Sequence, residues 1–262
     1  MDNRITRKFA QLKANNEKAL ITYVTAGDPN LKATADLVLA MEQAGADIVE
    51  LGIPYSDPLA DGPVIQAASR RALQGGTTLS KIFDMITGLR EETQIPLVLM
   101  TYVNPIIQYG VENFAAKAAK AGVDGLIIPD LPSEEMEILK GPMNEAGVAI
   151  IPLVAPTSTE SRIAKIAEEA QGFIYCVSLT GVTGVREQVG QNVEAFMQRV
   201  RKYTDKPLAI GFGVSTPEQA AQMVKAADGV IVGSALVKVI AELGDGSNGE
   251  IARLVKALKD AI

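Results

Sequence analysis

The sequence predicts a (β/α)8 barrel, an α/β fold in which eight parallel strands are each followed by a helix. Eight short runs rich in Val, Ile and Leu recur along the 262 residues, and they are apolar throughout rather than alternating. Continuous hydrophobicity indicates strands buried on both faces, as in a parallel sheet covered by helices. Helix-like segments separate these runs at nearly regular spacing, and eight such units in about 250 residues is the usual size of this barrel.

Local residue patterns place each element. The expected strands span residues 20–24, 48–53, 97–102, 125–129, 149–154, 173–177, 208–211 and 229–232. Asp28-Pro29 predicts an N-cap and first-turn proline for a helix that begins near Leu31 and ends at Gly45. Residues 157–160 have the pattern of a capping box. Further helices are expected at 79–92, 111–121, 133–146, 192–203, 216–226 and 250–262.

A doubly wound open sheet is the structural alternative. It would not need eight nearly regular repeats, and the first strand lacks the glycine-rich dinucleotide fingerprint that usually follows in that fold. An extra helix around residues 5–13 is expected to plug the N-terminal end of the barrel. No linker-like or low-complexity stretch divides the chain, so residues 1–262 are expected to form one domain.

Composition narrows the partners and the compartment. Lys and Arg number 25 against 31 Asp and Glu, for a net charge of −6, and no basic block is present. Nucleic acid and anionic membranes are therefore poor partner candidates. The single Cys176 lies in an apolar run and cannot form an internal disulfide. The N-terminus is polar and amphipathic, and no apolar run has membrane-spanning length, so we expect a cytoplasmic protein.

Two carboxylates in unlike surroundings are the main catalytic candidates. The chain contains no histidine, so other groups must move protons near neutral pH. Glu50 lies within an apolar strand, where burial would raise its pKa; the alternative is a structural carboxylate satisfied by backbone donors. Asp61 follows in a loop that also contains Asp57 and Pro58, where an aspartate can serve turn chemistry alone.

Glycine-rich loops after the last three strands predict a phosphate site. They comprise residues 178–190, Gly211-Phe212-Gly213 and the segment from Gly233 into a short helix at 235–241. Glycine permits close backbone approach, and helix N-termini attract anions. Singly, each loop can be a tight strand-to-helix turn, but three in succession favour a phosphate cradle. The loop at 178–190 is longer than usual and is interpreted as a lid, with a plain connection as the alternative.

Two absences limit the reaction. No expected strand contains Lys, so no strand supplies a Schiff-base lysine. With no histidine, the chain also lacks the usual ligand set of a catalytic zinc. A phosphorylated substrate would therefore have to carry its own electron sink, while Glu50 and Asp61 supply proton transfers.

The run LGIPYSDPLADGP at residues 51–63 resembles the signature of the tryptophan synthase alpha subunit family. The resemblance extends over essentially the whole chain, through residues 23–29, 102–105, 129–132, 156–158, 175–178, 180–184 and 211–213. It implies a (β/α)8 barrel with an added N-terminal helix and a short phosphate-binding helix after the eighth strand. The implied reaction is a retro-aldol cleavage of indole-3-glycerol phosphate to indole and glyceraldehyde 3-phosphate.

The resemblance also implies roles for individual residues. Glu50 would be the general acid and base, and Asp61 would accept a hydrogen bond from the indole nitrogen. Phosphate binding maps onto Gly184, Gly213, Gly233 and Ser234, with Tyr175 and Thr183 nearby, and the indole pocket would be walled by Tyr23, Ile65, Met100 and Phe212.

The implied partner is a beta subunit that contains pyridoxal phosphate (PLP), in an α2β2 heterotetramer with an indole tunnel. The chain itself would hold no cofactor and no metal, and Asp57, Pro58 and the loop at 178–190 would couple the two active sites. Two other functions stay open: a barrel that binds a phosphate metabolite and only activates a partner, and another sugar-phosphate isomerase.

Overall fold

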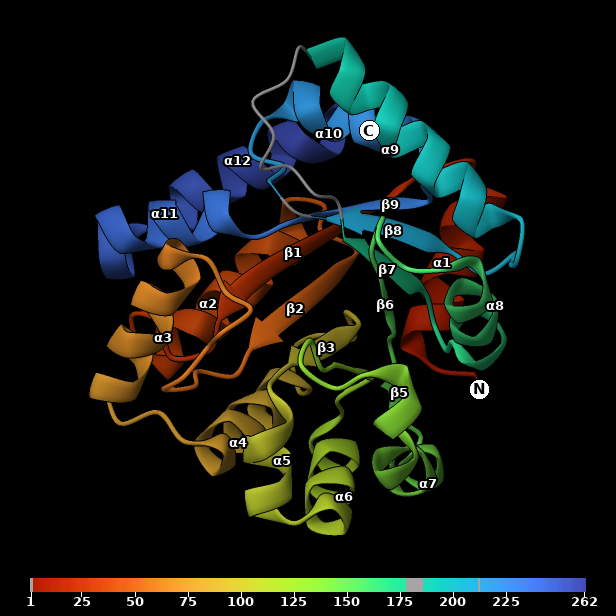
Figure 1. Ribbon diagram of the computed structural model, residues 1–262. Coiled ribbons are helices and arrows are strands. Elements are labelled where there is room, and N and C mark those ends of the chain that lie inside the picture. The colour runs from red at the N-terminus through yellow and green to blue at the C-terminus, as the bar shows by residue number, and fades with distance from the viewer. Residues whose placement is uncertain (1, 178–185, 212) are drawn as a thin grey trace.

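A nine-stranded parallel sheet forms the centre of the molecule, as the computed structural model of residues 2–177, 186–211 and 213–262 shows (Figure 1). The strands are β1 Ala19–Thr25, β2 Ile48–Gly52, β3 Leu97–Met100, β4 Gly125–Ile127, β5 Ala149–Ile150, β6 Leu153–Val154, β7 Ile174–Val177, β8 Leu208–Gly211 and β9 Gly229–Val232. Their order in the sheet is β5-β4-β3-β2-β1-β9-β8-β7-β6. All eight predicted strand regions are confirmed, and the helices lie around them as expected for the barrel.

The fifth predicted strand is divided in two, and this division closes the barrel. β5 pairs with β4, whereas β6 pairs with β7, so the two ends of the sheet are consecutive pieces of chain. Between them, the amide of Ile151 donates to the Leu126 carbonyl at 2.9 Å, and the Pro152 carbonyl accepts from the Tyr175 amide at 3.0 Å. Proline has no N–H to donate to a ladder, which accounts for the interruption.

Helices cover the outside of the sheet. They are α2 Leu31–Gln43, α3 Pro63–Gln74, α4 Leu79–Leu89, α5 Val103–Tyr109, α6 Val111–Ala121, α7 Glu137–Ala146, α8 Glu160–Glu169, α9 Arg186–Arg201, α10 Pro217–Met223, α11 Ser234–Leu243 and α12 Asn248–Asp260. Short 3-10 turns lie at Ser133–Glu135, Val224–Ala226 and Gly244–Gly246. Helices α3 and α5 had no counterpart in the sequence analysis.

Two predicted helix caps are wrong. Asn30 rather than Asp28 caps α2, with its side chain accepting from the Ala33 amide at 2.8 Å. The Asp28 carboxylate is instead bonded by the Arg71 guanidinium, at 2.8 and 2.7 Å. The cap of α8 is Thr159, so its helix begins two residues later than a capping box starting at residue 157 would require.

The predicted N-terminal helix is confirmed as α1, Arg4–Ala14, and it plugs one end of the barrel. A capping box between Asn3 and Thr6 starts it. Ile5 and Phe9 pack into the cluster of strand side chains that fills the barrel interior. The Phe9 and Phe173 ring centroids lie 5.6 Å apart, and a methyl group at Gly125 would lie 2.9 Å from Ile5 Cδ1. The N-terminal end of the barrel is therefore solidly packed.

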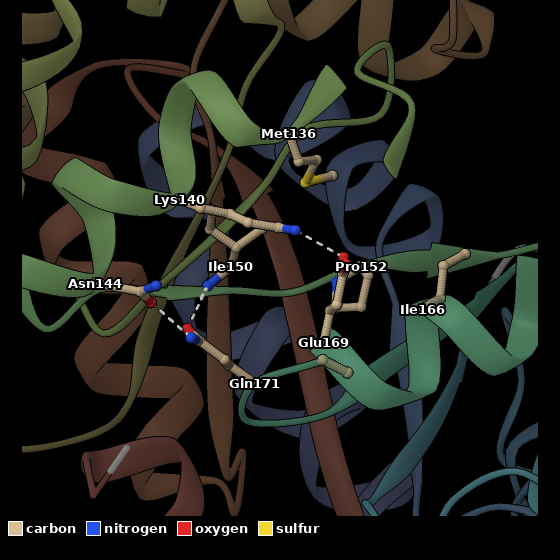
Figure 2. Close-up of a pocket in the computed structure, with 9 residues that line it drawn as sticks. Met136, Lys140, Asn144, Ile150, Pro152, Ile166, Glu169 and Gln171 are labelled. Carbon is tan, nitrogen blue, oxygen red and sulfur yellow. Dashed lines mark hydrogen bonds and ion pairs between the residues drawn. The ribbon is translucent and has the colours of Figure 1, made fainter. Parts of the chain in front are cut away.

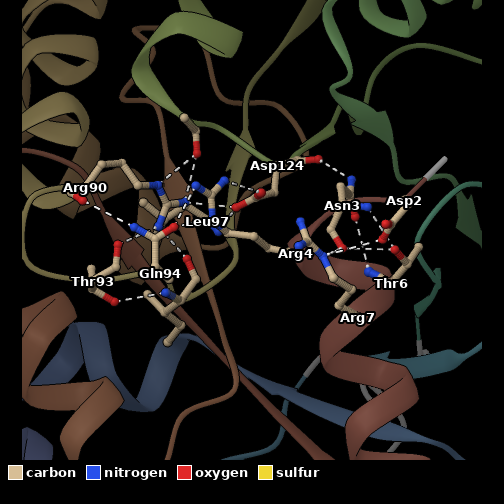
Figure 3. Close-up of polar contacts among 12 residues, drawn as sticks. Asp2, Asn3, Arg4, Thr6, Arg7, Arg90, Thr93, Gln94, Leu97 and Asp124 are labelled. Atoms are coloured by element: carbon tan, nitrogen blue, oxygen red, sulfur yellow. Dashed lines mark hydrogen bonds and ion pairs between the residues drawn. The ribbon is translucent and has the colours of Figure 1, made fainter.

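Aspartates at the N-terminal ends of three strands clamp neighbouring strands together. Asp47, Asp124 and Asp228 stand just before β2, β4 and β9, and each accepts a hydrogen bond from the first or second amide of the preceding strand, Leu20, Leu97 and Leu208. Each also pairs with a cation. Figure 3 shows the Asp124 clamp, in which Arg90 and Arg4 approach from opposite sides at 2.9 and 3.0 Å. This end of the barrel thus contributes stability.

Candidate active site

Glu50 projects into the barrel from β2. Ile48 belongs to the interior cluster, and side chains two apart on a strand share a face, so Glu50 points the same way. Its side chain is completely buried, and burial raises its pKa from 4.5 to about 8. Neither carboxylate oxygen has a hydrogen-bond partner among the described residues. A carboxyl group in this state can give and take a proton near neutral pH.

Tyr23 lies beside Glu50 in the register of β1 and β2. Its ring passes across Gly52, where a methyl group would fall 2.0 Å from the tyrosine oxygen, so this position requires glycine. Burial raises the pKa of Tyr23, and the charges of Asp61 and Glu50 raise it further. Tyr23 therefore stands within electrostatic reach of both candidate carboxylates.

An apolar wall adjoins the two carboxylates. Tyr23, Ile65 and Met100, which the sequence analysis assigned to one pocket, meet in a single hydrophobic cluster with Ala68 and Val237. The cluster joins β1, β3, α3 and α11. Three of the four expected indole-pocket residues are thus brought together by the fold, and the fourth, Phe212, lies outside the described residues.

Asp61 stands two residues before α3, in the loop that follows β2. Gly62 is the N-cap of this helix and Pro63 its first residue, a pairing that suits a helix start. The Asp61 side chain is partly buried, and burial raises its pKa, while a hydrogen bond from Tyr102 lowers it. Tyr102 is a residue of the site that the sequence analysis did not assign, although its segment was among those that resemble the family.

The expected coupling residues lie on the outer part of the same loop. Asp57 is exposed and accepts a hydrogen bond from the Ser56 hydroxyl at 2.6 Å, and Pro58 is partly buried. Leu59 next to them is 94% exposed. This loop therefore carries a catalytic candidate at one end and an exposed apolar side chain at its tip.

Glycines and the N-terminus of a helix form the other end of the site. Gly233 is the N-cap of α11, the predicted short helix after the last strand, and Ser234 is its first residue. Gly213 has a φ of 80°, which favours glycine. At Gly211 a methyl group would fall 2.6 Å from the Tyr175 hydroxyl. Among the described residues no side chain caps α11, and the amides of a helix N-terminus suit an anion.

These two ends of the site are adjacent. A methyl group at Gly233 would lie 3.2 Å from Tyr23 Cβ. Burial raises the pKa of Tyr175, and the charges of Glu50 and Tyr23 act in the same direction. The anion-binding backbone, the apolar wall and the buried carboxylate therefore surround one region at the carboxyl ends of the strands, where (β/α)8 barrels hold their active sites.

Part of the predicted site lies outside the described residues. Thr183 and Gly184 fall in the undescribed segment 178–185, and with them most of the predicted lid. The lid prediction is wrong at its C-terminal end, because residues 186–190 already belong to α9.

The described residues contain no group of three or more acidic, cysteine or histidine side chains that could hold a metal ion. Within the same residues, no helix is long and apolar enough to cross a membrane.

A separate cavity of about 230 Å³ lies outside the barrel, between α7 and α8 (Figure 2). Lys140 of α7 bonds Glu169 of α8 at 2.8 Å, and Gln171 bonds Asn144 at 2.6 Å. The polar side chains that line it already have partners, and Glu50 and Asp61 are not among its lining residues.

Comparison with known proteins decides the family. The family model described as "Tryptophan synthase alpha chain" matches residues 9–261. The chain belongs to the tryptophan synthase alpha chain family. A relative of that name from Alkaliphilus metalliredigens is 55% identical over 260 residues, covering 98% of this chain and 97% of the relative. Another, from Geobacter sulfurreducens, is 51% identical over 265 residues, covering 99% of each chain.

Solved structures agree with this family. The tryptophan synthase alpha subunit of Legionella pneumophila superposes with a TM-score of 0.93 at 38% identity, covering 100% of this chain and 99% of that one. A structure of the tryptophan synthase a2b2 complex from Pyrococcus furiosus matches with a TM-score of 0.86 at 39% identity, covering 92% and 97%. The barrel prediction is thereby confirmed, and this tryptophan synthase alpha chain is a lyase of tryptophan biosynthesis that cleaves indole-3-glycerol phosphate.

Proposed function

We propose that Glu50 is the general acid and base of indole-3-glycerol phosphate cleavage and that Asp61 stabilises the indole ring during the reaction. The observation that carries this proposal is the state of Glu50, which is buried, has no hydrogen-bond partner among the described residues and has a pKa of about 8. At neutral pH such a group is protonated. It has a proton to donate and is then a base of suitable strength.

The reaction needs two proton transfers. Protonated Glu50 gives its proton to the indole ring carbon that bears the glycerol chain, which makes the ring an iminium-like cation. A base then removes the proton from the adjacent glycerol hydroxyl, and the Glu50 carboxylate is placed in that role. The hydroxyl oxygen becomes the aldehyde oxygen, the carbon–carbon bond breaks, and its electron pair returns to the ring.

Asp61 complements this chemistry by accepting a hydrogen bond from the indole N–H, because that nitrogen gains positive charge when the ring is protonated. The apolar wall of Tyr23, Ile65 and Met100 would hold the ring. The phosphate would lie against Gly213, Gly233 and Ser234, with Tyr175 beside it; Gly184, Thr183 and Phe212 are expected to complete the two subsites.

Substitution tests these roles. Glu50→Gln should bind indole-3-glycerol phosphate but lose nearly all turnover, because Gln neither donates nor accepts the proton. Glu91→Gln, on the surface, is the matched control. Asp61→Asn should likewise lose turnover. Its control is Asp84→Asn, which changes an exposed side chain on α4. Near-parental turnover of Glu50→Gln would remove Glu50 from the mechanism.

The chain is further proposed to act without a cofactor and to pass indole to a beta subunit that contains PLP, in an α2β2 complex. Leu59 and Ile107, exposed by 94% and 53%, both follow carboxyl ends of strands and suit a partner surface next to Asp57 and Pro58. We place the chain in the cytoplasm as one barrel domain. Titration of indole release against added beta subunit tests the partnership, and Leu59→Ser should weaken the response. A response identical to that of the parent would exclude this loop from the interface.

A further inference from the structure

We propose that Tyr102 is a positioning residue that holds Asp61 in its working place by anchoring the loop at the neighbouring residue, Ala60. The Tyr102 hydroxyl accepts a hydrogen bond from the Ala60 amide at 2.9 Å. Ala60 is the residue next to Asp61, so this bond fixes the backbone at the point where the Asp61 side chain begins, and hydrogen bonding by Tyr102 also lowers the Asp61 pKa. This inference rests on the proposed role of Asp61 and names the residue that keeps that role available.

The loop that carries Asp61 has few other anchors. Within it, the Leu59 amide bonds the Asp57 carbonyl at 2.9 Å, and the Asp61 amide bonds the Pro58 carbonyl at 3.1 Å. From α3, Gln66 donates to the Asp61 carbonyl at 2.8 Å. These bonds shape the loop but run only to itself and to the helix that continues it. Among the described hydrogen bonds of residues 56–61, those of Tyr102 are the ones that tie the loop to another strand unit.

Tyr102 is itself well fixed. It stands two residues after the end of β3, is the N-cap residue of α5, and is only 6% exposed. The Tyr55 ring packs on its ring with centroids 5.2 Å apart, and Asn104 donates to the Tyr55 hydroxyl at 3.1 Å. The hydroxyl therefore occupies a defined point, and a loop bonded to it acquires the rigidity of the barrel.

The electrostatic surroundings of Asp61 make the effect of Tyr102 measurable as a shift in the Asp61 pKa. Asp61 faces Tyr102 from β3 and Tyr23 from β1, Glu50 lies beyond Tyr23, and Asp130 acts on Tyr102. Burial raises the Asp61 pKa, and the Tyr102 hydroxyl is the hydrogen-bond donor that opposes this rise. Removing the hydroxyl should therefore both loosen the carboxylate and raise its pKa, leaving less of the anion that the indole N–H requires.

The experiment compares kcat and KM across pH for Tyr102→Phe and for Tyr109→Phe, which loses a hydroxyl on α5 away from the loop. We expect kcat of Tyr102→Phe to fall about ten-fold, the size of one hydrogen bond to a charged group, with KM little changed. The acid limb of its kcat profile should move to higher pH. Tyr109→Phe should match the parent, and circular dichroism should show that both variants fold.

A double variant separates positioning from direct action on the substrate. In an Asp61→Asn background, Tyr102→Phe should cause no further loss of kcat. The full ten-fold loss in that background would overturn the inference, because Tyr102 would then act without Asp61. An unchanged kcat and acid limb in the single variant would also overturn it.

Failure of the proposed function is distinguished by Asp61→Asn alone, since parental turnover there removes Asp61 from catalysis. The clamp is then judged by hydrogen exchange of the Ala60 amide, which should be faster in Tyr102→Phe than in the parent. Equal exchange would overturn the clamp itself.

Discussion

Replacing Glu50 by Gln should make the folded protein more stable at neutral pH while abolishing turnover. The parent carboxyl is buried without a hydrogen-bond partner in the described structure, and its pKa is raised from 4.5 to about 8. Gln has the same shape and is neutral at every pH. The variant has no carboxyl group to ionise. It therefore avoids the free-energy cost of burying this ionisable group, which destabilises the parent at neutral pH.

The direction and size of this difference in the free energy of unfolding follow from proton binding to Glu50. Because the folded-state pKa is raised, folded protein retains the Glu50 proton at pH values where the unfolded chain releases it. The associated stability is fully present below pH 4.5 and is lost progressively as pH rises to about 8. At about 1.36 kcal/mol per pH unit, the parent has lost about 3 kcal/mol at pH 7 and about 5 kcal/mol above pH 8.

Urea unfolding followed by circular dichroism at a series of pH values measures this directly. The Glu50→Gln and parent free energies of unfolding should coincide near pH 4.5 and separate steadily up to about pH 8, with Gln the more stable. Glu91→Gln, which changes an exposed carboxylate, should follow the parent throughout. A Glu50→Gln difference that stays constant across this range would refute the assignment of a raised pKa.

Three further changes test the framework of the site. Asp124→Ala removes the carboxylate that neutralises the Arg90 guanidinium, which is only 10% exposed, and should lower the free energy of unfolding by about 3 kcal/mol or more, measured by urea unfolding. Ile5→Ala empties the plug and should cost about 2 to 5 kcal/mol in the same assay, with turnover kept once the protein is folded. Gly233→Val crowds the backbone expected to bind phosphate and also presses on buried Tyr23, so it should raise KM on the order of ten-fold and lower the free energy of unfolding; an unchanged KM would place the phosphate elsewhere.

Local patterns were sufficient for the strands because each is buried on both faces, and burial on both faces requires an apolar run. They were also sufficient for Glu50, since a carboxylate inside such a run is unusual in itself. Helix α3 was missed because residues 56–63 suggest turns. The Gly62-Pro63 pair and the spacing of Ile65, Ala68 and Ala72 were nevertheless available as signals of a helix.

Other features depend on contacts between distant parts of the chain. Asp28 was predicted as a cap, but its carboxylate is bonded by Arg71, which stands 43 residues further along. The role of Tyr102 depends on a loop from another strand folding over it, 42 residues away at Ala60. Such pairings are set by the closed barrel rather than by neighbours in sequence, so a local pattern does not reveal them.

Helix α1 packs against the interior side chains at the N-terminal end of the barrel and closes that end. Ile5 and Phe9 fill one end of the barrel interior, so among the described residues that end offers no way in to Glu50, and the opposite rim is the end at which the site lies. Substrate and product would therefore enter and leave at the same end of the barrel, beside the loop that carries Leu59. A partner bound at that rim, as proposed above, would therefore control both the entry of substrate and the route by which indole leaves.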